Sequence, residues 1–291
     1  MTKKARTVRE FIGKSSVYLP LTVLVCAIIH KLLTFKVELF GSAEVSATMS
    51  SVIALLLPLM LIARASAPRK ISLGSNSLSV SHLFVVLLAT VFICVAYVAA
   101  AVISDKYLPS SFPISLFNLP HTQSASAVGI IFIAIIPAIC EELFFRGVLI
   151  SEYLKYSSTV ALTVSTALSA MFALNLYTLP FACLIGLALG AMRIYTDSTL
   201  VPVFMRCVGI LSLLLIRGRS FYAVINDNLV IYTILALALL FFSTFVTVMA
   251  MARSMPSFTT YADGDFGREE KRLTLFSPAT VVMLIILLLM R

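Results

Sequence analysis

Long runs of apolar residues dominate the hydropathy pattern of this chain, and most are close to the length of a membrane-spanning helix. A helix needs about 20 apolar residues to cross the hydrocarbon core of a bilayer. The pattern therefore predicts an all-α fold, a polytopic transmembrane helix bundle with about eight to nine spans. The predicted spans lie near residues 17–34, 48–64, 80–103, 127–150, 158–178, 181–194, 198–216, 229–251 and 276–290. The sixth and ninth runs are short and could be re-entrant or tilted.

The composition agrees with a lipid environment. The chain is 60% hydrophobic and 12% charged, with a mean hydropathy of +1.04, whereas about 25% of the residues of a soluble domain are charged. The net charge of +9 does not indicate nucleic-acid binding, because the basic residues lie at the ends of the apolar runs. We therefore expect membrane lipid as a partner and no nucleic acid.

Polar segments divide the predicted bundle into three regions. Residues 1–126 hold about three spans and a long loop, residues 127–216 form a core of four helices, and residues 217–291 hold the last spans. A polar segment of mixed charge, residues 254–274, interrupts the last region. Lys and Arg in the short loops predict a multi-pass protein of the cell (inner or plasma) membrane with a cytoplasmic N-terminus. The first apolar run is expected to be an uncleaved span.

Chemically reactive residues concentrate in the fourth predicted span, which reads Cys-Glu-Glu-Leu-Phe-Phe-Arg-Gly at residues 140–147. Glu142 and Arg146 are four residues apart on one helix face, with the glutamate on the N-terminal side, so we expect an ion pair that clamps the bundle. Glu141 points about 100° away and has no basic partner on its own helix. Burial and the neighbouring carboxylate should raise its proton affinity, which suits a general base.

This run resembles the EExxxRG signature of the CPBP family, the CAAX-processing and bacteriocin-processing intramembrane proteases that are also called the ABI family. The similarity extends from about Val128 to Leu213. In that family the signature is followed by FxxxH on the next helix and HxxxN two helices later. The resemblance implies an endopeptidase in which the glutamate and the histidines activate a water, with metal dependence reported for members. The residues that carry the later part of the similarity are Gly186, Gly190, Thr196, Ser198 and Pro202.

Both motif histidines of the family are replaced in this chain. The FxxxH position reads Met171-Phe-Ala-Leu-Asn175, and the HxxxN position reads Arg206-Cys-Val-Gly-Ile210. An asparagine can orient a water but cannot ionise, and an arginine cannot shuttle protons as a histidine does. The candidate catalytic residues implied by the resemblance are Glu141, Glu142, Arg146, Asn175 and Arg206, the last two at the positions of the family histidines.

The candidate residues are expected to converge. Counting along the helices places Glu141, Asn175 and Arg206 at about the same depth on three helices. A buried guanidinium keeps its charge and seeks a carboxylate, and Glu141 is the nearest unpaired one. This pair would lower the proton affinity of Glu141 and make it a poor base.

The sequence offers few ligands for a metal. Zinc needs three or four ligands from His, Cys, Asp or Glu. The core offers Glu141, Glu142, Cys140 and Cys207 but no histidine. We therefore expect no cofactor, although the resemblance leaves a divalent metal open. The three histidines, which we interpret as interfacial or packing residues, are His30, His82 and His121.

Three functions stay open from the sequence. The first is an active intramembrane peptidase that uses Glu141 in a non-standard site with Asn175. The second is a catalytically impaired or inactive relative that binds a membrane-anchored protein or peptide in the same cavity. The third is a small-solute carrier with a polar cluster at mid-membrane, which the EExxxRG run makes less favoured. We favour the second because both histidines are replaced.

Overall fold

Every described element of the computed structural model is a helix, which confirms the predicted all-α class over these residues. The structure describes residues 18–33, 43–56, 58–59, 80–107, 130–154, 156–172, 179–217, 228, 230 and 271–289. Apart from residue 230, the eighth predicted span, 229–251, lies outside the described residues, as does most of the predicted polar loop 254–274.

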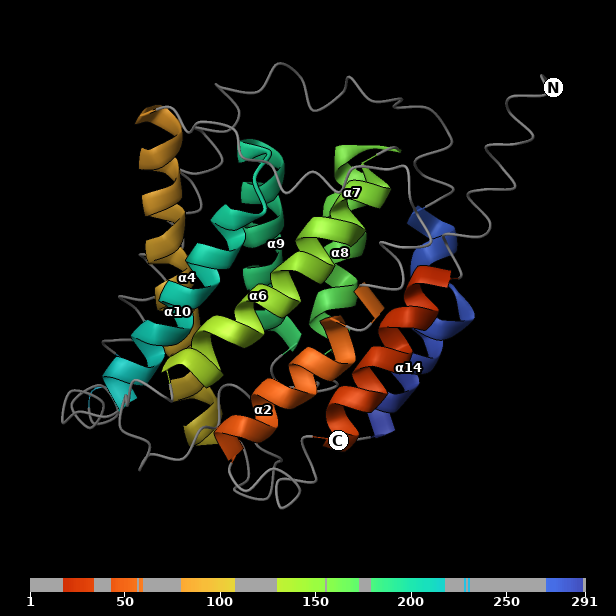
Figure 1. Ribbon diagram of the computed structural model, residues 1–291, viewed down its shortest axis with the longest axis horizontal. Coiled ribbons are helices and arrows are strands. Elements are labelled where there is room, and N and C mark those ends of the chain that lie inside the picture. The colour runs from red at the N-terminus through yellow and green to blue at the C-terminus, as the bar shows by residue number, and fades with distance from the viewer. Residues whose placement is uncertain are drawn as a thin grey trace.

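A continuous helical segment runs through the middle of the bundle (Figure 1). It consists of the π-helix η3 (Ile130–Ile135), α6 (Ile136–Glu142), the π-helix η4 (Leu143–Leu149) and α7 (Ile150–Tyr153). We call it the central helix. It corresponds to the fourth predicted span, and its position lets both sides of the bundle pack against it.

Two apolar clusters form the core, and the central helix contributes to both. The first cluster joins it to helices from both ends of the chain and to the helix that follows it. These are Tyr18–Leu33, η2 (Val52–Leu56), α8 (Ser158–Phe172) and α14 (Pro278–Leu289). The helix α2 (Ala43–Ser51) contacts the central helix along η3 and α6. The second cluster joins it to α4 (Val80–Tyr107), α9 (Leu179–Thr196) and α10 (Leu200–Arg217).

Small residues allow α9 to approach α8 closely. A Cβ atom on Gly190 would lie 2.8 Å from Leu162 Cδ1, and one on Gly186 would lie 3.3 Å from Thr166 Cγ2. Glycines four residues apart form a stripe along one helix face, and such stripes are typical of close helix pairs in membranes. The two helices are therefore held at a distance that any larger side chain would increase.

Both π-helical segments of the central helix have backbone carbonyls that accept hydrogen bonds from side chains of neighbouring helices. Pro137 has no N–H, so a carbonyl about one turn earlier lacks its helical donor, and the hydroxyl of Thr48 on α2 donates to the carbonyl of Phe132. In η4 the hydroxyl of Ser165 on α8 donates to the carbonyl of Phe145 at 3.0 Å. Such donors matter in a bilayer because lipid tails offer none.

Short polar turns connect the helices after the central segment. The Ser157 hydroxyl accepts a hydrogen bond from the backbone N–H of Val160 at 3.1 Å and so caps the start of α8. Between α9 and α10, Arg193 donates to the carboxylate of Asp197 at 2.7 Å. Asp197 has a positive φ of 48°, which aspartate tolerates better than most residues and which reverses the chain.

Two of the described helices are long and apolar enough to cross a membrane, His82–Ala101 and Leu179–Thr196. The apolar helices Tyr18–Leu33, Ser158–Phe172 and Leu200–Leu215 are shorter. The expectation that the sixth span is short was wrong, because α9 continues for 18 residues. The total of eight to nine spans stays a prediction.

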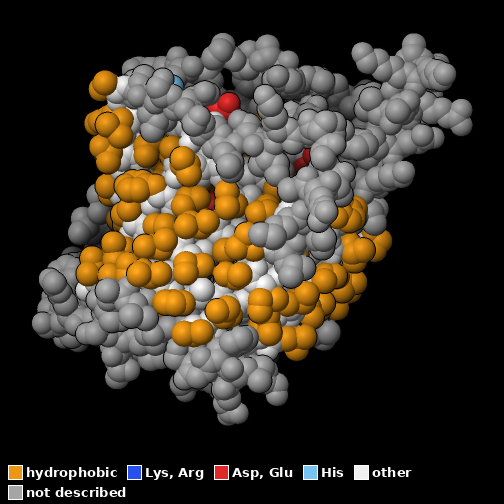
Figure 2. All heavy atoms as spheres, in the orientation of Figure 1, with side chains coloured by type: hydrophobic (Ala, Val, Ile, Leu, Met, Phe, Trp, Pro, Cys, Tyr) orange, Lys and Arg blue, Asp and Glu red, His pale blue; other side chains and the backbone are white. Residues whose placement is uncertain are grey.

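Large apolar side chains are exposed along one face of α4. Val80, Phe84, Leu87 and Val91 recur every three to four residues, which places them on one stripe of the helix. Figure 2 shows hydrophobic side chains gathered over the middle of one face of the molecule. Soluble monomers rarely expose contiguous apolar surface on this scale, whereas a lipid-facing helix requires it.

Removal of the Ser165 hydroxyl tests whether its hydrogen bond from α8 stabilises η4. Ser165→Ala is expected to lower the free energy of unfolding by about 1 kcal/mol, because the buried carbonyl of Phe145 loses one of its two donors and keeps only the backbone N–H of Ile150. The matched control is Ser151→Ala on α7, since the Ser151 hydroxyl has no hydrogen-bond partner among the described residues. Unfolding of both variants in the same detergent measures the difference. Equal stability of the two would contradict this role of Ser165.

Candidate functional site

The two adjacent glutamates stand at the junction between α6 and the π-helix η4. Glu142 is the last residue of α6 and is fully buried, whereas the side chain of Glu141 is 12% exposed. π-helical turns are rare and are frequently found at functional sites. The change of helical type thus coincides with the residues that carry charge.

Arg206 on α10 reaches both carboxylates. Its Nη1 donates to Glu142 Oε1 at 2.8 Å, and its Nη2 donates to Glu141 Oε2. The planar fork of an arginine presents several donors in fixed directions, so one guanidinium can serve two acceptors. The predicted pair of Arg206 and Glu141 is therefore present, and it extends to Glu142.

Arg146 holds the other side of Glu142. Its Nε lies 3.1 Å from Glu142 Oε2, which is the ion pair expected from the spacing of the two residues. Its Nη2 donates to the carbonyl of Gly186 on α9 at 3.2 Å and to the hydroxyl of Ser169 on α8 at 3.4 Å. A Cβ on Gly186 would lie 3.3 Å from this Nη2, so glycine allows the backbone of α9 to come close to the guanidinium.

Charges of opposite sign balance within this group. We call Glu141, Glu142, Arg146 and Arg206 the charged cluster, which has two carboxylates and two guanidiniums. Buried charges persist only when they are paired and hydrogen-bonded. The two expected pairs, Glu142 with Arg146 and Glu141 with Arg206, are both present, and the contact of Arg206 with Glu142 joins them into one network.

Of the motif positions Asn175 and Ile210, the structure describes only Ile210. Asn175 lies outside the described residues, so its expected convergence with Glu141 stays a prediction. Ile210, at the position where the resemblance implies asparagine, is fully buried in the apolar cluster of α4, α9 and α10.

The described histidines pack against aromatic rings. The ring of His30 lies 5.0 Å from that of Phe172, and the ring of His82 meets that of Tyr195 edge-on at 4.8 Å. His121 lies outside the described residues. The two ring contacts agree with the packing role expected for His30 and His82.

The charged cluster does not fit a catalytic metal. Within the described residues, no three His, Cys, Asp or Glu side chains come together as a metal-binding group. Glu141 and Glu142 supply two carboxylates, and Arg206 donates to both of them. Because a catalytic zinc needs about three protein ligands and an open position, the donor set is too small and already holds a cation.

Tyr97 on α4 also lies in this neighbourhood, although the sequence pattern did not point to it. The side chain is 2% exposed, and its phenol interacts electrostatically with all four members of the charged cluster. In the sequence it is, with Thr90, one of two hydroxyl-bearing residues inside a long apolar run, and no spacing rule connects it to Glu141 or Arg206.

Comparison with known families identifies the region that contains the charged cluster. Residues 123–226 match the family model described as type II CAAX prenyl endopeptidase Rce1-like. These residues form an Rce1-like domain. The match encloses the similarity seen from Val128 to Leu213 and confirms the relation to the CPBP family. Neither the curated proteins nor the solved structures contain a match to the chain.

The Rce1-like domain includes every member of the charged cluster, whereas α2, α4 and α14 lie outside it. The family match and the apolar helices indicate a membrane protein whose residues 123–226 are similar to the CAAX proteases. Tyr97 therefore reaches the charged cluster from a helix that the family match does not cover.

Measurements of the free energy of unfolding can test whether the buried charge of Glu141 depends on Arg206 as its partner. Arg206→Met is expected to destabilise the fold by about 3–5 kcal/mol, the usual cost of removing one partner of a buried pair. Adding Glu141→Gln should restore part of this loss, because it removes a carboxylate that has lost its cation. The midpoints of unfolding in one detergent give the comparison.

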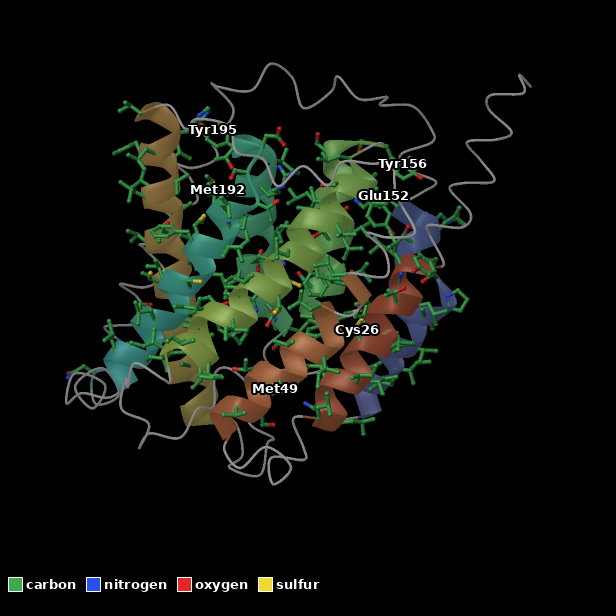
Figure 3. All side chains as sticks on the ribbon, in the orientation of Figure 1. Cys26, Met49, Glu152, Tyr156, Met192 and Tyr195 are labelled. Atoms are coloured by element: carbon green, nitrogen blue, oxygen red, sulfur yellow. The ribbon has the colours of Figure 1, made fainter. Side chains whose placement is uncertain are left out.

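The matched control for this experiment is Glu152→Gln in the Arg206→Met background. Glu152 belongs to the same central helix but lies near its end, beside Tyr156 (Figure 3). Neutralising it should restore nothing. Equal restoration by the two glutamine substitutions would show that Glu141 does not depend on Arg206.

Proposed function

We propose that the protein is a catalytically inactive or strongly impaired relative of the type II CAAX prenyl endopeptidases that binds a membrane-anchored protein or peptide without cleaving it. The observation that carries the proposal is the pairing of Arg206 with both Glu141 and Glu142. We further propose that it lies in the cell membrane with a cytoplasmic N-terminus, in accordance with the Lys and Arg residues of the predicted short loops.

The proposed loss of catalysis follows from the ion pair, because the Arg206 guanidinium occupies the Glu141 carboxylate. A general base must accept a proton from a water within hydrogen-bonding reach. In this chain Glu141 Oε2 accepts from Arg206 Nη2, so one of its oxygens is already engaged. A cation at hydrogen-bonding distance stabilises the charged carboxylate and weakens it as a base.

The residue that replaces the family histidine cannot supply the missing step. An imidazole can accept and release a proton near neutral pH, whereas an arginine remains protonated in proteins. Arg206 is therefore suited to hold Glu141 and Glu142 in place and not to transfer protons. The asparagine expected at the other motif position, Asn175, can bind a water but cannot ionise.

Binding is supported by the part of the charged cluster that stays accessible. The side chains of Glu141 and Arg206 are 12% and 13% exposed, whereas Glu142 has no exposure. A ligand that reaches this side meets carboxylate oxygens and guanidinium N–H groups together. A peptide backbone offers the complementary N–H and carbonyl groups, so we propose a prenylated peptide or protein tail, held in membrane lipid, as the ligand.

The direct test uses the purified protein in lipid nanodiscs with a prenylated CAAX-type peptide that carries a photoreactive group. We expect a crosslinked product with the intact peptide and no cleavage fragments, because Glu141 is not free to activate water. Mass spectrometry reports the crosslink and the fragments in the same sample. An unprenylated peptide of the same sequence controls for capture that does not depend on the lipid anchor.

Two glutamine variants decide whether any cleavage belongs to the charged cluster. Cleavage by the wild type that disappears in Glu141→Gln and persists in Glu152→Gln would overturn the proposal and establish an active peptidase. Absence of both crosslinking and cleavage would reject the binding role. The expected result is crosslinking without fragments in the wild type and in Glu152→Gln, and weaker crosslinking in Glu141→Gln, which removes an accessible carboxylate of the charged cluster.

Restoration of the family motifs provides an independent prediction. The triple substitution Asn175→His, Arg206→His and Ile210→Asn is expected to create cleavage of the same peptide, because it frees Glu141 and supplies two imidazoles. The control is the same triple variant with Glu141→Gln, which should be inactive. Fragments that appear equally in both variants would contradict a role for Glu141 in the restored reaction.

A further inference from the structure

The side chain of Tyr97 packs directly against α10, the helix that carries Arg206. A Cβ atom on Gly209 of α10 would lie 2.7 Å from Tyr97 Cδ2 and 3.0 Å from its Cε2. Gly209 follows Arg206 by three residues, so the two positions are neighbours on the helix surface. The phenol ring therefore packs against the backbone of α10 at Gly209, within one helical turn of Arg206. The contact between α4 and α10 is the most extensive that α10 makes with another described helix.

The Tyr97 side chain lies near charges of both signs. Arg206, the two glutamates and Arg146 are all within electrostatic range of its phenol. A phenol can accept a hydrogen bond from a guanidinium and donate one to a carboxylate. If the position served packing alone, phenylalanine would fill the same space without placing a hydroxyl beside four buried charges.

The two carboxylate acceptors alone leave the rotamer of the Arg206 side chain incompletely fixed. Its Nε has no hydrogen-bond partner among the described residues, and its side chain is 13% exposed. A long, partly exposed side chain has other rotamers available, and holding one of them costs conformational entropy. A rigid ring fixed between α4 and α10 removes that freedom, because aromatic side chains have few rotatable bonds.

We propose that Tyr97 is a positioning residue of the charged cluster, whose phenol orients the Arg206 guanidinium across Glu141 and Glu142. The site then includes α4, a helix outside the residues matched by the Rce1-like family model. This inference concerns the geometry of the charged cluster and holds whether the protein binds or cleaves its ligand.

Infrared spectroscopy of the full-length protein in nanodiscs tests the proposal. The carboxylate stretching band of Glu141 is assigned as the band that disappears in Glu141→Gln. Tyr97→Phe keeps the ring and removes the hydroxyl, and it is expected to shift this band. Tyr153→Phe, which removes the hydroxyl of another fully buried tyrosine, should leave the band where it is.

A double-mutant cycle provides the second readout. The unfolding midpoints of Tyr97→Phe, Arg206→Met and the double variant should be non-additive, because residues in one network share their energy. A Glu141 band that is unchanged in Tyr97→Phe, together with additive midpoints, would overturn the proposal and leave Tyr97 as a packing residue.

A second variant keeps the proposal testable if Tyr97→Phe does not fold. Gly209→Ala leaves the hydroxyl in place but pushes the ring away from α10, since its Cβ would lie 2.7 Å from Tyr97 and from Ile93. It is expected to shift the same Glu141 band. A folded Gly209→Ala protein with an unshifted band would contradict the positioning role.

Discussion

The double ion pair of Arg206 with Glu141 and Glu142 is the constraint on which the rest of the bundle depends. The cation belongs to α10 and the two anions end α6, so relative movement of these helices would leave a buried charge without its partner. Glu142 extends the network to Arg146, and Arg146 reaches the backbone of α9 at Gly186. The charged cluster thus ties α6, α9 and α10 together at one depth.

The apolar parts of the fold are arranged around this requirement. The central helix lies between two apolar clusters, which keeps water and lipid away from Glu142 and Arg146. Its π-helical turns are supported by the hydroxyls of Thr48 on α2 and Ser165 on α8. In a lipid environment these polar contacts have no competitor for the backbone, so a few of them can fix an irregular helix.

The sequence was sufficient for features that depend on spacing within one helix or on the cost of burying charge. Glu142 and Arg146 were expected to pair because they are four residues apart, and Arg206 was expected to seek Glu141 because a buried guanidinium needs a carboxylate. It was not sufficient for features that depend on how helices are rotated. Glu142 binds both arginines because α10 is oriented so that Arg206 reaches it as well as Glu141. The ring of Tyr97 packs against α10 because Gly209 has no side chain there.

The most direct test of the account is the position of the Arg206 guanidinium relative to both carboxylates in the lipid-embedded protein. Solid-state NMR with labelled guanidino nitrogen and side-chain carboxyl carbon can measure these distances, and Glu141→Gln and Glu142→Gln assign the two contacts. The account predicts that both carboxylates lie within ion-pair reach of the guanidinium, about 4 Å between nitrogen and oxygen. A guanidinium that contacts Glu142 alone, with Glu141 open to water, would contradict it.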